Sequence, residues 1–185
     1  LEQENFGSYE VIVVDDGSTD KTAAIARSYE PNIKVIVTAN SGVERASNLG
    51  ISQAAGKFVV RVDADDRLKP NYLAVMVPEL ERTEVSFVYS EYTQINAAGS
   101  PVKQVTLPDF DVVEIRERGD LLATGTLYRK DAIATVGGYN ERVKNCGLEN
   151  YELILRILAT GHAGKCIHRP LFDYRIHNSN MSQVR

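Results

Sequence analysis

Apolar and polar residues follow each other along the first half of the chain in blocks that predict strands and helices in alternation. The block at 9–14 is rich in β-branched residues and nearly continuous in its apolar character, which is typical of a strand buried on both faces. In chain order we predict strands over 9–14, 33–38, 57–62 and 85–92, and helices over 20–29, 42–55 and 70–82. The order βαβαβαβ predicts an α/β fold, an open, mostly parallel sheet with helices on both faces.

The second half of the chain is less regular. A hairpin turn is predicted at 97–101, followed by a short strand at 125–128, a short helix at 130–136, an amphipathic helix at 148–160 and one or two strands within 167–176. No repeat, low-complexity tract or linker separates these elements in the sequence. We therefore predict a single domain over residues 1–185.

Composition and charge narrow the kinds of partner. The chain has 185 residues, of which 43% are hydrophobic and 25% charged, as is ordinary for a globular domain. Its net charge of −4 gives no broad basic surface, so nucleic acid is not expected as a partner. No stretch reaches the roughly 20 apolar residues of a membrane helix. Cys146 and Cys166 are expected to be reduced thiols, and the chain, which starts at Leu1, is expected to begin inside a longer protein.

An acidic cluster follows the third predicted strand. Asp63, Asp65 and Asp66 come directly after the strand at 57–62. Carboxylates crowded at a sheet edge repel one another, and such a cluster is typical of a site for Mg²⁺ or Mn²⁺, which take one or two carboxylates together with substrate phosphates. The alternative is a solvated acidic turn before a helix that begins near Pro70.

A second acidic pair, Asp15 and Asp16, follows the first predicted strand. Ligands of open α/β sheets bind beyond the carboxyl ends of the strands, where an Asp can bind a base or ribose. The alternative is a turn that caps the next helix. Gly42 would let the backbone approach a ligand at the start of the helix at 42–55, whose first N–H groups are free; the alternative there is an ordinary helix start with packing glycines.

Taken together and in this order, six segments resemble the family 2 glycosyltransferases of the GT-A fold. The segments are VIVVDDGSTDKT, NSGVERASNLG, FVVRVDADD, GTLYRKDAIATVGGYNE, GLENYELILRI and YRIHNSNMS, and the resemblance runs from about Phe6 to Ser182. It implies a Rossmann-like sheet, with a nucleotide-sugar-binding half over about 1–95 and an acceptor and catalytic half over about 96–185. Relatives have a strand and a helix before the position of Phe6. The resemblance thus implies that an N-terminal strand is missing here, which leaves an apolar sheet edge exposed or filled by another chain.

The resemblance also implies roles in the donor site. Asp16, with Asp15 beside it, would bind the nucleotide base. Asp63 would meet the ribose, and Asp65, assisted by Asp63 and Asp66, would hold Mn²⁺ or Mg²⁺ against the diphosphate of a UDP-sugar. The further residues expected near the phosphates are Arg45, Arg175 and His177, of which the last two have ordinary surface strand residues as their alternative.

The catalytic part departs from the family pattern. Family members usually invert the anomeric centre, and the Asp of a Glu-Asp pair deprotonates the acceptor hydroxyl as general base. The pair reads Glu149-Asn150 here, and an amide takes no proton at neutral pH. Three interpretations stay open: Glu149 or Glu152 is the base, Asn150 is an inactivating substitution, or the chain binds a nucleotide-sugar without transferring it. Glu149 lies about 100° and Glu152 about 200° around the helix from Asn150, so neither simply takes its place.

The predicted function is therefore inverting, metal-dependent transfer of a sugar from a UDP-sugar to a saccharide or lipid-linked acceptor, with a non-catalytic nucleotide-sugar-binding module as the alternative. A nucleotidyltransferase is a third hypothesis, although the first βα unit in the sequence lacks a Gly-rich, basic phosphate loop. By analogy we expect a role in polysaccharide biosynthesis, a cytoplasmic location with peripheral association with the inner face of the membrane, and a homodimer. Loops such as 93–117 are expected to select the donor sugar and the acceptor.

Overall fold

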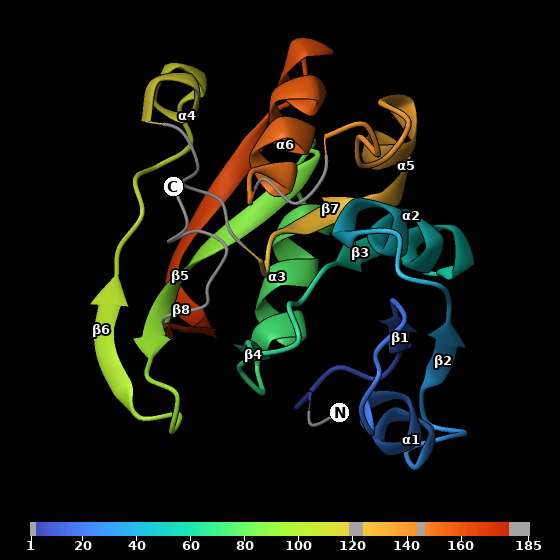
Figure 1. Ribbon diagram of the computed structural model, residues 1–185. Coiled ribbons are helices and arrows are strands. Elements are labelled where there is room, and N and C mark those ends of the chain that lie inside the picture. Colours follow the sequence, from blue (N-terminus) through green and yellow to red (C-terminus); the bar gives the residue numbers. More distant parts are fainter. Residues whose placement is uncertain (1–2, 119–123, 144–146, 178–185) are drawn as a thin grey trace.

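The centre of the molecule is a mixed β-sheet (Figure 1), seen in a computed structural model that describes residues 3–118, 124–143 and 147–177. The strands run in the order β3–β7–β5–β8–β4, and β6 also pairs with β5. Their bounds are β3 (Phe58–Val60), β4 (Arg67–Leu68), β5 (Phe87–Ile95), β6 (Pro101–Val105), β7 (Leu127–Arg129) and β8 (Gly164–Arg175). β5 and β8 pair in parallel, and the other pairs of this sheet are antiparallel.

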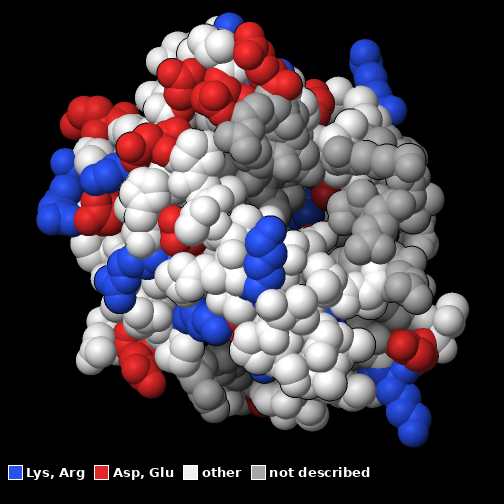
Figure 2. Space-filling model, turned by 90° about the vertical axis from the view of Figure 1, so that its left-hand side faces the viewer, with Lys and Arg blue, Asp and Glu red and all other residues white. Residues whose placement is uncertain are grey.

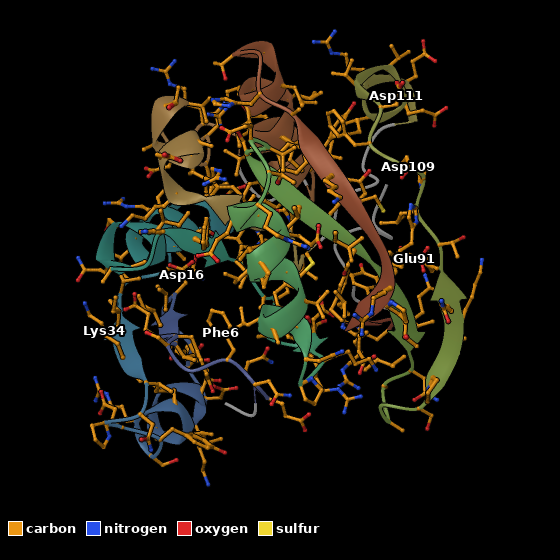
Figure 3. The ribbon with its side chains drawn as sticks, turned by 180° about the vertical axis from the view of Figure 1, so that it is seen from behind. Phe6, Asp16, Lys34, Glu91, Asp109 and Asp111 are labelled. Carbon is orange, nitrogen blue, oxygen red and sulfur yellow. The ribbon has the colours of Figure 1, made fainter. Side chains whose placement is uncertain are left out.

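Helices cover both faces of this sheet. The residues of β5 alternate between two core clusters: Phe87 and Tyr89 pack with α6 (Glu149–Ala159), and Val88 between them packs with α3 (Tyr72–Glu81). Successive side chains of a strand point to opposite faces of a sheet. The molecule is therefore layered, with α6 in front of the sheet in Figure 1 and α3 in front of it in Figure 3, which shows the reverse side.

The N-terminal part forms a separate unit at one side of the molecule (Figure 1). Its strands, β1 (Ile12–Asp15) and β2 (Lys34–Val37), pair in parallel, and α1 (Thr22–Arg27) and α2 (Val43–Gln53) accompany them. None of the residues of α1 is buried. Phe6 packs against the core cluster around α3 (Figure 3). Among the described residues β1 and β3 each pair along one edge only, so no ladder joins the two sheets there.

The α/β fold predicted from the sequence is confirmed, and every strand and helix predicted in the first half lies close to its expected position. The observed strand pairing differs in one respect from the mostly parallel sheet predicted from the sequence. β7, from the second half of the chain, lies between β3 and β5 and runs antiparallel to both, so the described strands do not form one mostly parallel sheet. The first strand is only half-buried along Ile12–Val14, not buried on both faces. The two-residue strand β4 and the helix α4 (Val112–Arg118) were not predicted, whereas α5 (Lys130–Thr135) was.

The surface gives few signals about partners. Figure 2 shows acidic and basic side chains mixed over the face on which β6 and α4 lie. Within the described ranges, no helix has the length and apolar character needed to cross a membrane. Cys166 is a buried free thiol, and Cys146 lies outside the described residues.

Candidate functional site

The acidic turn after β3 and the end of β8 meet at the carboxyl end of the sheet. Oδ2 of Asp65 lies 2.8 Å from Nε2 of His177, although the two residues are 112 positions apart in the sequence. The backbone N–H of Arg175 donates to Oδ1 of Asp66 at 2.8 Å. The pairing of β4 with β8 fixes this alignment, because β4 directly follows the turn. The structure thus brings together four of the residues that the sequence predicted for the donor site.

The Arg175 guanidinium is engaged by backbone carbonyls. Its Nε donates to the carbonyl oxygen of Asp65 at 2.8 Å. Its Nη1 donates to the carbonyl oxygens of Asn96 and Ala97, each at 3.0 Å. Arg175 therefore ties the hairpin between β5 and β6 to the acidic turn and fixes the position of that turn. Its role at a diphosphate stays a prediction.

Asp66 shows the effect of crowding carboxylates. Burial raises the pKa of its carboxyl to about 7; the Arg175 N–H opposes that rise, and the neighbouring Asp65 and Asp63 charges add to it. Its second oxygen, Oδ2, is buried without a hydrogen-bond partner among the described residues. Of the three carboxylates in the turn, Asp66 is thus held inward, whereas Asp65 faces His177.

Asp63 is bound to Arg61, two residues before it. Nη2 of Arg61 donates to Oδ1 of Asp63 at 2.8 Å and to Oε1 of Glu149 at 2.9 Å. The side chains of Arg61 and Glu149 are 14% and 7% exposed, so this contact is buried. Burial raises the pKa of Asp63, Arg61 lowers it, and Glu149 and Asp65 raise it, with a net upward shift. One guanidinium therefore links the acidic turn to the start of α6.

Asn150 and Glu152 are held away from this link. The Tyr139 hydroxyl donates to Oδ1 of Asn150 at 2.9 Å, and both side chains are buried. Burial raises the pKa of Tyr139 to about 12, so it stays a neutral donor. Glu152 accepts two hydrogen bonds from Arg156 and one from Asn140. Of the two glutamates considered as a base, Glu149 is linked to the acidic turn through Arg61, and Glu152 is not.

The first acidic pair holds the loop before α2. Asp16 accepts hydrogen bonds from the backbone N–H groups of Ser41 and Gly42 at 2.9 and 2.8 Å, and from the Ser41 hydroxyl at 3.1 Å. Asp15 is buried and accepts the Ser18 N–H at 2.7 Å. Figure 3 shows Asp16 between the end of β1 and the start of α2. The role of this pair at a nucleotide base stays a prediction.

Arg45 lies beside this loop. It lines a small hollow together with Ser41, Glu44 and Glu141. Since Ser41 is also the partner of Asp16, the hollow opens next to the first acidic pair. Gly42 has a φ of 100°, and its N–H is directed at Asp16. The glycine thus serves a backbone conformation that other residues rarely adopt.

Two residues of the site were missed in the sequence. Arg61 carries a signal that could have revealed it. It stands two positions before Asp63, a spacing that puts both side chains on one side of an extended chain, and it is the one charged residue in FVVRVD before the acidic cluster. Tyr139, whose ring lies 5.6 Å from the Arg61 guanidinium carbon, carries no such signal. Its contact with Asn150 depends on the packing of α6 against the turn after α5.

The arrangement of helices on a mixed sheet with acidic turns at strand ends is that of a GT-A glycosyltransferase. The structure of S. aureus TarS 1–349 in complex with UDP-GlcNAc superposes with a TM-score of 0.78 at 20% identity, over 100% of this chain and 55% of that chain. TarS 1–349 in complex with UDP gives 0.73 at 21% identity, over 95% of this chain and 54% of that chain. These likenesses establish the fold.

The chain belongs to the glycosyl transferase family 2, whose family model matches residues 1–138. It is 26% identical over 184 residues to the chondroitin synthase of Pasteurella multocida (strain Pm70), and the match covers 94% of this chain and 18% of that protein. It is 28% identical over 160 residues to the glycosyltransferase GlyG of Streptococcus pneumoniae serotype 4 (strain ATCC BAA-334 / TIGR4), and the match covers 76% of this chain and 53% of that protein. The family resemblance is confirmed, and the chain spans only part of the length of these relatives.

Proposed function

We propose that this chain is a glycosyltransferase domain that transfers a sugar from a UDP-sugar, with inversion and with the help of Mn²⁺ or Mg²⁺, to a saccharide or lipid-linked acceptor. Family membership and the TarS complexes with UDP and UDP-GlcNAc support a nucleotide-sugar as donor. The observation that carries the proposal is the contact of Asp65 with His177 at the carboxyl end of the sheet.

The residues at this contact fit a divalent cation in part. A carboxylate oxygen and an imidazole nitrogen are both metal ligands, and they face each other at 2.8 Å with both side chains partly exposed. No group of three or more His, Cys, Asp or Glu side chains suited to a metal occurs in the described ranges. Mg²⁺ and Mn²⁺ sites commonly combine one or two protein ligands with substrate phosphates. Asp65 and His177 would therefore hold the ion jointly with the diphosphate, and the ion would neutralise charge on the leaving UDP.

The other predicted donor residues take supporting places. Asp63, bound to Arg61, would face the ribose with its remaining oxygen. Asp66 and Arg175 would keep the acidic turn in place through the hydrogen bond between them. Asp16 would serve the base from the loop that begins α2. This proposal assigns His177 to the ion itself, whereas the sequence predicted only that it lies near the phosphates.

Asn150 favours a second candidate, a module that binds a nucleotide-sugar without transferring it. The side chain at the family position of the base is an amide, buried and held by Tyr139. An acceptor hydroxyl cannot lose its proton to that amide. Release of UDP from a panel of UDP-sugars, with and without saccharide acceptors, separates the two candidates, because the module would bind UDP and release none from the sugar donor.

Substitution of Asp65 tests the metal. In calorimetry with the wild type, Mn²⁺ should strengthen UDP binding relative to EDTA. Asp65→Asn should lose at least about tenfold of that gain, since the neutral amide is a poorer ligand for a hard cation. The matched control is Asp109→Asn, which alters another aspartate in contact with a histidine but lies away from the acidic turn. An unchanged Mn²⁺ effect in Asp65→Asn would sink the metal assignment.

A further inference from the structure

Arg61 is placed where the two halves of the site join. It follows β3, and its backbone carbonyl accepts the N–H of Gly125 and the hydroxyl of Thr124, both at 3.1 Å. The Thr124 hydroxyl in turn accepts the N–H of Asp63 at 3.0 Å. These hydrogen bonds hold the backbone of Arg61 in place. One nitrogen of its guanidinium, Nη2, contacts both Asp63 and Glu149. Among the described residues, no other ion pair joins the acidic turn to α6.

This ion pair is a poor device for stability. Nε and Nη1 of Arg61 and Oε2 of Glu149 are buried with no hydrogen-bond partner among the described residues. Moving charges out of water is costly, and the cost is recovered only when geometry is good and the remaining donors and acceptors are satisfied. Apolar side chains of similar size would fill the same space without that cost. The pair is therefore better explained by a role in function than by a role in stability.

We propose that Arg61 is a positioning residue, which holds the Glu149 carboxylate against the acidic turn so that it borders the sugar of the bound donor. This inference rests on the proposed function. The diphosphate of the donor would lie at Asp65 and the acceptor at the start of α6, so the sugar lies between them. A side chain that joins the acidic turn to α6 would then border that sugar. Oε1 of Glu149 is held by Arg61, so the acceptor for a sugar hydroxyl group would be the buried Oε2, which has no partner among the described residues, whereas Asn150 is turned to Tyr139.

The experiment compares the affinity for UDP with that for UDP-glucose, UDP-galactose and UDP-GlcNAc, by calorimetry with Mn²⁺ present. The test variant is Arg61→Met/Glu149→Met, which removes both charges and keeps the volume. The quantity compared is the ratio of the two affinities, because Arg61 also binds Asp63 and so bears on UDP itself. In the test variant, the extra affinity for the preferred UDP-sugar over UDP should be lost. Its thermal midpoint should be unchanged or raised, because a buried pair replaced by apolar side chains is often neutral or stabilising. A purely structural role predicts a lower midpoint instead.

Two further variants complete the design. Arg61→Lys should recover part of the preference for the UDP-sugar, because both contacts run through one nitrogen, which an ammonium can replace. The matched control, Lys165→Met/Glu79→Met, removes the ion pair between β8 and α3, whose atoms lie 2.7 Å apart. It should leave the ratio of the two affinities unchanged.

The outcomes separate this inference from the proposed function. A wild type that binds neither UDP nor any UDP-sugar contradicts the proposed function. A wild type that binds UDP with no preference for a UDP-sugar, or a test variant that keeps the wild-type preference, overturns the role of Arg61 while nucleotide binding stands. Loss of the preference in the test variant, with recovery in Arg61→Lys, supports it.

Discussion

The two ends of the candidate site differ in how far water reaches them. At the end that we propose for the donor, called the donor end below, the side chains of Asp65 and His177 are 39% and 30% exposed. At the α6 end, Glu149 and Asn150 are 7% and 9% exposed. Both ends consist of polar side chains that already contact a partner within the chain. The ends are therefore distinguished by access rather than by the presence of contacts.

That difference decides which contacts a ligand can replace. A contact between partly exposed polar side chains contributes little, about 0–1 kcal/mol even for a full ion pair, so Asp65 and His177 can exchange each other for a ligand at small cost. A buried pair that loses one partner costs about 3–5 kcal/mol, so Glu149 cannot leave Arg61 so readily. The donor end is suited to reversible binding, and the α6 end is suited to keeping one geometry.

The largest expected effect is on stability, when the buried link alone is cut. Arg61→Met leaves Glu149 buried without a cation and should lower the free energy of unfolding by about 3–5 kcal/mol. His177→Ala, at the open end, should lower it by less than about 1 kcal/mol. Urea denaturation of the two variants measures both changes. Equal losses in the free energy of unfolding would show that burial does not distinguish the two ends.

The next effect concerns turnover at the buried end. Asn150→Asp places a carboxylate where the Tyr139 hydroxyl can still donate to it. General bases contribute about 10²–10⁴-fold to rate, so UDP release from UDP-sugars in the presence of Mn²⁺ should rise by about 100-fold if only the base is missing. Asn32→Asp, an exposed site before β2, is the matched control for the added charge. No rise in Asn150→Asp, with UDP affinity intact, favours the binding module.

Part of this site could be predicted because it follows from local pattern. The acidic residues Asp63, Asp65 and Asp66 come after a short apolar strand, so their position at the end of that strand was readable, and their role at a ligand stays a prediction. The helix that begins at Glu149 is amphipathic, with Leu153, Ile154 and Ile157 fully buried, so its position was readable, although the burial of its first residues was not. Where a residue's environment is set within one strand or one helix turn, the sequence was sufficient.

The remainder depends on contacts between distant segments. β7 is three residues long, and nothing in Leu127–Arg129 shows that it lies between β3 and β5. Likewise, Asp65 meets His177 only because β4 pairs with β8 across the sheet. Glu149 in turn meets Arg61, which lies 88 positions earlier. Such contacts are set by tertiary packing, which outweighs local propensity.

The smallest expected effect tests whether a contact between histidine and carboxylate is special to the donor end. His168 lies between Asp109 and Glu91, at 2.9 and 3.3 Å. Figure 3 shows these two acidic residues on the side of the sheet near β6. The Asp109 hydrogen bond first, and then Glu91, raise the pKa of His168 above its usual value. The nearby Cys166 thiol has its pKa raised by burial to about 11 and stays neutral near pH 7.

A histidine whose pKa is raised by folding stabilises the protein below its unfolded pKa of about 6.5, and this stabilisation is lost as the pH rises through the folded value. His168→Gln should therefore melt a few degrees at most below the wild type at pH 6, with the gap closing by pH 9, as thermal scans would measure. Because this site is away from the acidic turn, the variant should keep the full Mn²⁺ effect on UDP binding, whereas His177→Gln should lose it. A loss in both variants would mean that exposure at Asp65 and His177 does not mark the donor end.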